Sequence, residues 1–134
     1  MIQKEITDGN KLIAKFMGWV FKKGLFTTQL SNSSGEYYDD EVEETIWWDA
    51  DGFPKEDGLR FHRSWNELMP VVEKIESMGN HFPIEKNGAL VSAPYPKEEE
   101  KSGLYCVTEY IEGKTKIEAT WKAVVEFLKL QGKK

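Results

Sequence analysis

The fold is decided near the C-terminus, where residues 115–132 read TKIEATWKAVVEFLKLQG. Thr115 and Glu118 match a capping box, in which each side chain accepts a hydrogen bond from a backbone amide that the first helical turn leaves free. Apolar residues then recur at helical spacing and share one face: Ile117, Trp121, Val124, Val125 and Leu128. This pattern predicts a helix over about 115–131, with Phe127 lying off its apolar stripe.

Two further helices are predicted upstream of this segment. Apolar residues at helical spacing indicate a first helix over about Asp8–Met17. The second begins near Ser64, because Ser64 and Glu67 match another capping box. Pro70 removes a backbone hydrogen bond, so we expect the beginning of this helix to be irregular.

The remaining segments predict loops and short strands. Residues 30–35 are polar and rich in turn formers, whereas Glu43–Trp48 contains residues that suit a pleated surface. Asn87-Gly88 is typical of a two-residue hairpin turn, and residues 104–111 form the clearest strand. The fold class predicted from this order is α+β, with about three helices packed on a small, mostly antiparallel sheet.

Length and composition indicate one domain without disulfide bonds. The chain has 134 residues, which we assign to a single domain over 1–134. The single Cys106 excludes an intramolecular disulfide, and its place in a predicted strand suggests a small buried side chain. No apolar run approaches the roughly 18 residues of a membrane span, and the first residues lack the apolar stretch of a signal peptide. We therefore expect a cytoplasmic protein.

The charge is concentrated in one part of the chain. The formal net charge is −5. Residues 36–57 contain ten acidic residues against Lys55 alone, so this window carries −9 and the rest of the chain +4. The overall charge excludes a protein that coats DNA through a basic surface. Whether the acidic segment 31–58 is ordered or flexible remains open at this stage.

Three segments resemble small proteins of phages and prophages, especially those of Bacteroidota. They read NKLIAKFMGW at 10–19, HRSWNELMPVVEKIE at 62–76 and GKTKIEATWKAVVEF at 113–127. Together they are similar to the phage "ABA sandwich" domain, with a first helix that ends in Met-Gly-Trp and a second that carries Trp and then Val-Val-Glu. The resemblance covers about forty residues and implies a mobile-element origin and an α+β sandwich. It transfers no catalytic residue.

The motifs of common enzymes are absent from the sequence. The two histidines lack the spacing of a zinc protease, and no glycine-rich phosphate loop occurs. Asp49-x-Asp51-Gly52 resembles the start of a calcium loop, but no Glu stands at its twelfth position. We therefore predict a protein that is not an enzyme, with no catalytic residue, no metal and no cofactor.

The acidic window also holds aromatic residues, which are frequent at interaction hot spots. Successive strand side chains point to opposite faces, so we expect Trp48 to enter the core and Trp47 to face outward. The alternative, an acidic loop with both indoles directed inward, is about equally supported. The predicted partner-binding residues are Tyr37, Tyr38, Asp39, Asp40, Glu41, Trp47, Asp49 and Asp51.

A second candidate surface is basic. Lys116, Lys122 and Lys129 lie opposite the apolar face of the predicted third helix. Such lysines give weak, salt-sensitive contact with nucleic acid, but they are also ordinary on a solvated helix. We favour the ordinary interpretation, so direct nucleic-acid contact is not the preferred function.

These observations predict a non-enzymatic phage or prophage protein that binds a host protein in the bacterial cytoplasm. The most specific form of this hypothesis is an inhibitor of a host defence nuclease, of the anti-CRISPR type. Such an inhibitor binds a Cas ribonucleoprotein or another enzyme that handles nucleic acid. Three alternatives stay open: a module that binds a small ligand or a nucleotide, an accessory protein of phage structure or assembly, and a metal-dependent enzyme that uses Asp and Glu.

Overall fold

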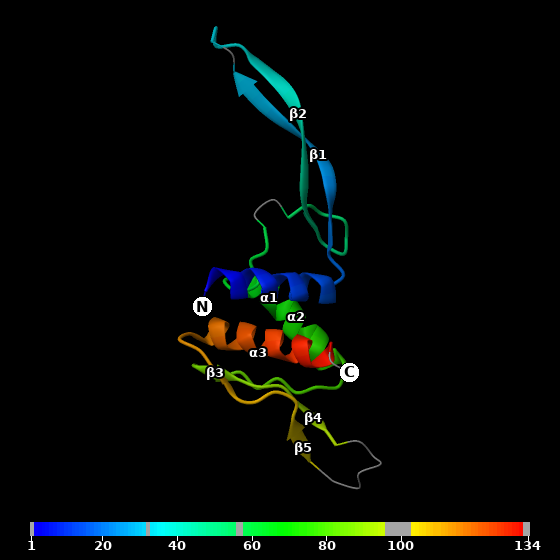
Figure 1. Ribbon diagram of the computed structural model, residues 1–134, viewed down its shortest axis with the longest axis vertical. Helices are drawn as coiled ribbons and strands as arrows, with labels where there is room; N and C mark the ends of the chain where they lie inside the picture. The colour runs from blue at the N-terminus through cyan, green and yellow to red at the C-terminus, as the bar shows by residue number, and fades with distance from the viewer. Residues whose placement is uncertain (1, 32, 56–57, 96–102, 133–134) are drawn as a thin grey trace.

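The computed structural model describes residues 2–31, 33–55, 58–95 and 103–132. Their order is helix, long hairpin, helix, four short strands and helix (Figure 1). The bounds are α1 Gln3–Phe16, β1 Val20–Ser31, β2 Tyr37–Trp48, α2 Trp65–Ser77, β3 Gly88–Ala89, β4 Ser92–Pro94, β5 Leu104–Cys106, β6 Ile111–Glu112 and α3 Lys116–Gln131. The chain is therefore α+β, as predicted, but its strands form three antiparallel pairs, β1–β2, β3–β6 and β4–β5, and not one sheet.

The helix α3 lies at the centre of the molecule, between α1 on one side and the β3–β6 pair on the other (Figure 1). A helix that is covered on two sides needs two apolar faces. Phe127, which lies off the predicted stripe, is accordingly fully buried, as are Ala119 and Ala123. The single-stripe prediction for this helix was therefore incomplete.

The two capping boxes predicted from the sequence have different outcomes. At α3, Thr115 Oγ1 accepts a hydrogen bond from the Glu118 amide at 3.2 Å, and Glu118 Oε2 accepts one from the Lys114 amide at 3.0 Å. At α2, the Ser64 side chain makes no capping hydrogen bond. Glu67 instead accepts from the Arg60 amide at 3.2 Å, so its carboxylate holds the loop before the helix.

The other helix predictions need smaller corrections. The helix α1 begins at Gln3, five residues before the predicted start. In α2 the helix continues through Pro70 without interruption, because tertiary burial of Leu68, Val71 and Val72 outweighs the loss of one backbone bond. The predicted irregular beginning is therefore wrong.

A long hairpin, β1–β2, rises from the layer of helices (Figure 1). We call residues 20–48 the arm. Each strand has 12 residues, and the antiparallel register runs from Val20 opposite Trp48 at the base to Ser31 opposite Tyr37 near the tip. The predicted loop over 30–35 is shorter than expected, because Leu30 and Ser31 belong to β1, whereas residues 33–35 form the turn at this tip. The sequence analysis found only the last six residues of β2 and missed β1.

The predicted strand over 104–111 is divided in two. The amides of Val107 and Thr108 both donate to the Val91 carbonyl oxygen, at 2.8 and 3.1 Å. Two residues opposite one define a β-bulge, which bends the strand. The chain therefore pairs with β4 before the bulge and with β3 after it. Cys106 is exposed, contrary to the expected burial.

The turn at Asn87-Gly88 is longer than predicted. Ile84 and Ala89 form an isolated bridge, and the Glu85 amide donates to the Gly88 carbonyl oxygen at 2.7 Å. Four residues, not two, therefore connect the paired positions. Within the described ranges, no helix has the length and apolar character required to cross a membrane.

The contact between α1 and α3 depends on the absence of a side chain at Gly9. A Cβ atom at this position would lie 2.5 Å from Cζ2 of Trp121 and 2.9 Å from a methyl group of Val125. Alanine normally favours a helix over glycine by about 1 kcal/mol. Glycine at position 9 therefore lowers the helix propensity of α1. In exchange, it lets the indole of Trp121 pack against the α1 backbone.

The first prediction concerns this contact. We expect Gly9→Ala to lower the free energy of unfolding by about 1–3 kcal/mol, because the clash exceeds the gain in helix propensity. The change is measured by urea denaturation. Asp8→Ala, at the exposed neighbouring position, is the control and should stay within about 0.5 kcal/mol of the parent. A stabilised Gly9→Ala variant would contradict the close packing.

Candidate functional site

The acidic residues of the arm lie on one strand. β2 contains Asp39, Asp40, Glu41, Glu43 and Glu44, whereas β1 contains only the basic pair Lys22 and Lys23. With Glu36 at the tip, the arm carries a net charge of −4. The Lys23 ammonium and the Glu43 carboxylate form an ion pair at 3.4 Å with both side chains exposed, and such a pair contributes little to stability.

Those predicted partner-binding residues whose side chains the structure describes do not form one patch. Tyr37, Tyr38, Asp39 and Asp40 are on the outer half of β2, where their side chains lie outside the described part of the structure. Glu41 is exposed and is paired with Thr27 in the register. Trp47 is six residues further along the strand, about 20 Å away at 3.3 Å per residue. The acidic half and the aromatic base of the arm are therefore separate surfaces.

The orientation predicted for the two tryptophans is wrong. Trp47 packs against the core cluster, and its ring stacks on that of Phe21 with centroids 5.3 Å apart. Trp48 lies on the other face of the ribbon, where its Nε1 donates to the Lys22 carbonyl oxygen at 3.2 Å. The alternation was correct, but the sequence did not show that α1 lies beneath the base of the arm.

Asp49 has a structural role at the end of β2. Its Oδ1 accepts hydrogen bonds from the amides of Phe53 and Asp51, at 2.9 and 3.0 Å, and its Oδ2 lies 3.6 Å from the Lys55 ammonium. The hydrogen bond from Phe53 is the main cause that lowers the pKa of this carboxyl below its usual value. Asp51 is exposed. The described residues contain no cluster of His, Cys, Asp or Glu that would hold a metal ion.

The three lysines predicted as a basic face are divided between two hollows. Lys122 and Lys129 line a groove between α1 and α3, together with the acidic residues Glu5, Asp8 and Glu126. Lys116 lines a different, shallow hollow beside Trp65. Lys122 also forms an ion pair with Glu118 at 3.2 Å. The mixed charge of the groove agrees with an ordinary solvated helix surface.

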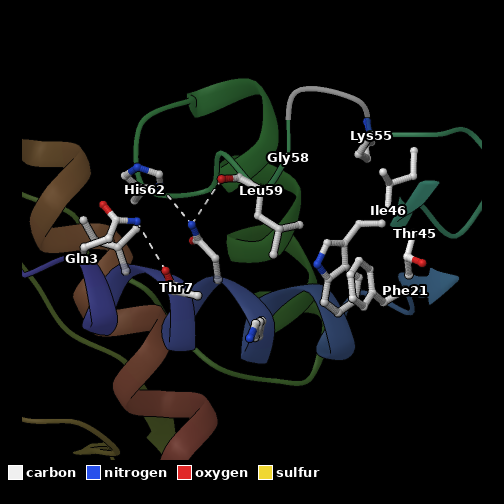
Figure 2. Close-up of a pocket in the computed structure, with 13 residues that line it drawn as sticks. Gln3, Thr7, Phe21, Thr45, Ile46, Lys55, Gly58, Leu59 and His62 are labelled. Carbon is white, nitrogen blue, oxygen red and sulfur yellow. Dashed lines mark hydrogen bonds between the residues drawn. The ribbon is translucent and has the colours of Figure 1, made fainter. Parts of the chain in front are cut away.

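A pocket of about 370 Å³ lies at the base of the arm. One wall is α1, the second is the paired ends of β1 and β2, and the third is the loop that leads to α2 (Figure 2). Figure 2 shows the ring of Phe21 on one side of this space and His62 and Gln3 on the other. The sequence analysis missed this pocket because its residues come from three separated segments and form no motif.

The floor of the pocket is a hydrogen-bonded network centred on Asn10, which is almost completely buried. Asn10 Oδ1 accepts from Trp121 Nε1 at 2.8 Å. Its Nδ2 lies 2.9 Å from His62 Nδ1 and 3.4 Å from the Leu59 carbonyl oxygen (Figure 2). Because the Asn10 oxygen is occupied by Trp121, the amide nitrogen donates to His62, and the imidazole is neutral with its proton on Nε2.

Comparison of the chain with protein-family models, curated proteins and solved structures found no match.

The second prediction concerns the pH dependence of the Asn10 network. Burial, and to a lesser extent the charge of Arg63, lower the pKa of His62 below its usual value of 6.5. The folded state therefore favours neutral His62. Its contribution to stability is present above pH 6.5 and is lost as the pH falls through the folded-state pKa.

We expect the melting temperature to fall between about pH 7.5 and about pH 5.5, and His62→Gln to reduce this fall, because glutamine offers an acceptor that does not titrate. Thermal unfolding monitored by circular dichroism measures the difference. His81→Gln changes an exposed histidine and should leave the pH dependence of the parent unchanged. An equal effect of both variants would contradict the role assigned to His62.

Proposed function

We propose that this chain is a non-enzymatic binding protein whose acidic arm contacts a basic surface on a partner protein. The observation that carries this proposal is the shape and charge of the arm. Glu41, Glu43 and Glu44 are exposed on a ribbon that projects from the helices (Figure 1). Carboxylates held on a projecting element raise the rate of encounter with a positively charged partner.

The apolar content of the arm supports an interface. Phe21 is 56% exposed and Leu25 is 70% exposed. Exposed apolar side chains within a charged surface provide the area whose removal from water stabilises a complex. Apart from the base of β2, where Trp48 is bridged to Pro54, the hairpin pairs with no further strand among the described residues, so backbone groups along its outer edges are open to a further strand.

The class of partner follows from the sign of the charge. Proteins that handle nucleic acid present strongly basic surfaces to the phosphate backbone, and an acidic ribbon is complementary to such a surface. Together with the resemblance to phage and prophage proteins, this charge complementarity favours a host nuclease as the partner. The most specific form of the proposal is a Cas ribonucleoprotein that is inhibited in the manner of anti-CRISPR proteins. Occupation of a nucleic-acid channel by the arm is sufficient for inhibition and needs no catalytic residue in this chain.

The third prediction tests the arm by charge reversal. We expect the triple variant Glu41→Lys, Glu43→Lys and Glu44→Lys to fold as the parent does, because these side chains are exposed. It should lose at least about tenfold in capture of nucleic-acid-handling proteins from host lysate, since attraction becomes repulsion. Quantitative mass spectrometry of tagged-protein pull-downs measures the loss.

The control variant changes Glu73, Glu76 and Glu109 to lysine, which shifts the net charge equally but at exposed positions outside the arm. It should capture the same proteins as the parent. If the two triple variants lose the same partners to the same extent, total charge and not the arm governs binding, and the proposal fails. It also fails if the parent captures no protein that handles nucleic acid.

A further inference from the structure

The pocket at the base of the arm differs in charge from the rest of the molecule. Its lining contains Lys11, Lys55 and His62, and none of the described lining residues is Asp or Glu. The whole chain has 23 acidic residues and a net charge of −5, so a lining whose charged members are only lysines is unusual; Lys55 is paired with Asp49 and His62 is neutral, which leaves Lys11 as the main positive charge. Glu56 and Asp57 lie between Lys55 and Gly58 in the sequence but outside the described residues.

One side of the pocket is aromatic. The Phe21 and Trp47 rings stack at 5.3 Å with an angle of 25° between their planes, and both residues line the cavity. Trp47 is anchored in the core, whereas Phe21 remains more than half exposed. An aromatic ring that is fixed from behind and open in front offers a surface on which a planar ligand can stack.

Polar groups line the rest of the pocket, with His62 on the side opposite Phe21 (Figure 2). His62 uses Nδ1 to accept from Asn10, which leaves its Nε2–H as a donor. Lys11 extends from α1 and lines the same cavity, and it forms no ion pair within the described part of the chain. Lys55 is partly engaged, because its ammonium contacts Asp49 and lies 5.1 Å from the centre of the Trp19 ring.

We propose that this pocket binds a small ligand that combines one aromatic base with one phosphate, as a nucleoside monophosphate does. The base stacks on Phe21, and the phosphate is held by Lys11 with the Nε2–H of His62 as a second donor. Aromatic side chains stack well on nucleobases of any identity, and lysine and histidine N–H groups are donors for phosphate. The volume of about 370 Å³ lies within the range of small-ligand sites. This inference does not rest on the partner proposed for the arm, although Phe21 contributes to both surfaces.

The test uses the full chain and isothermal titration calorimetry with the four common nucleoside monophosphates. We expect at least one to bind. Adenosine, which lacks the phosphate, and inorganic phosphate, which lacks the ring, should each bind at least about tenfold more weakly than the best monophosphate. Perturbation of the assigned indole signal of Trp47 in a two-dimensional NMR spectrum places the ligand in the pocket.

Matched variants separate the two halves of the site. Lys11→Gln should weaken binding of the monophosphate about tenfold, whereas Lys15→Gln, one helical turn away on α1 and exposed, should leave it unchanged. Phe21→Leu keeps an apolar side chain but removes the ring, and it should weaken binding of the monophosphate while leaving the weak binding of phosphate as it was. Melting temperatures confirm that each variant is folded.

Three results would overturn the inference. The first is that none of the four monophosphates binds at millimolar concentration. The second is that phosphate alone binds as tightly as the best monophosphate, since the aromatic wall would then contribute nothing. The third is that Lys11→Gln and Lys15→Gln have the same effect. None of these results bears on the acidic half of the arm, so the two proposals fail separately.

Discussion

The buried hydrogen bond from Trp121 to Asn10 connects the centre of the fold to the pocket. Polar groups removed from water need hydrogen-bond partners. The side chain of Asn10 finds them at Trp121 on α3 and at Leu59 and His62 in the loop before α2. The amide of one side chain therefore fixes the distance between three segments. Gly9, immediately before it, lets α1 approach the Trp121 ring closely enough for this bond to form. Without that approach, the amide oxygen of Asn10 would be buried without its hydrogen-bond donor on α3, at a cost of about 1–3 kcal/mol.

The arm is held at its base by contacts of a different kind. A two-stranded hairpin is only marginally stable in water on its own, so the arm needs an anchor. Trp47 supplies it by packing on the core, and the Lys55 amide donates to the Trp47 carbonyl oxygen at 2.8 Å. The turn organised by Asp49 brings Lys55 back to this position. The residues that anchor the arm are thus also the residues that close one side of the pocket.

The parts of the fold that follow local rules could be predicted from the sequence. The capping pair and apolar spacing of α3 predicted its bounds to within about one residue, and the turn formers at 30–35 predicted a loop, of which residues 33–35 form the turn. The second buried face of α3 could not be predicted, because it depends on what covers the helix. β1 was missed because Lys22, Lys23 and Gly24 interrupt any alternation of apolar and polar residues. Its pairing with β2 is tertiary information. The pocket could not be predicted for the same reason: its walls come from segments that are far apart in the sequence and meet only in the folded chain.

The acidic window of the sequence is therefore not a single functional unit. Asp49 uses its charge internally, where backbone amides and Lys55 compensate it, and such a carboxylate has little attraction left for a partner. Glu41, Glu43 and Glu44 are exposed on the arm, where they repel one another, and Lys23 pairs with Glu43. Binding of the positive surface proposed above would reduce this repulsion and would therefore stabilise the complex relative to the free protein. Lys11 in the pocket forms no ion pair among the described residues, so its charge remains available to an anionic ligand. The position of each charge, and not the net value of −5, therefore sets the sign of charge that each surface favours.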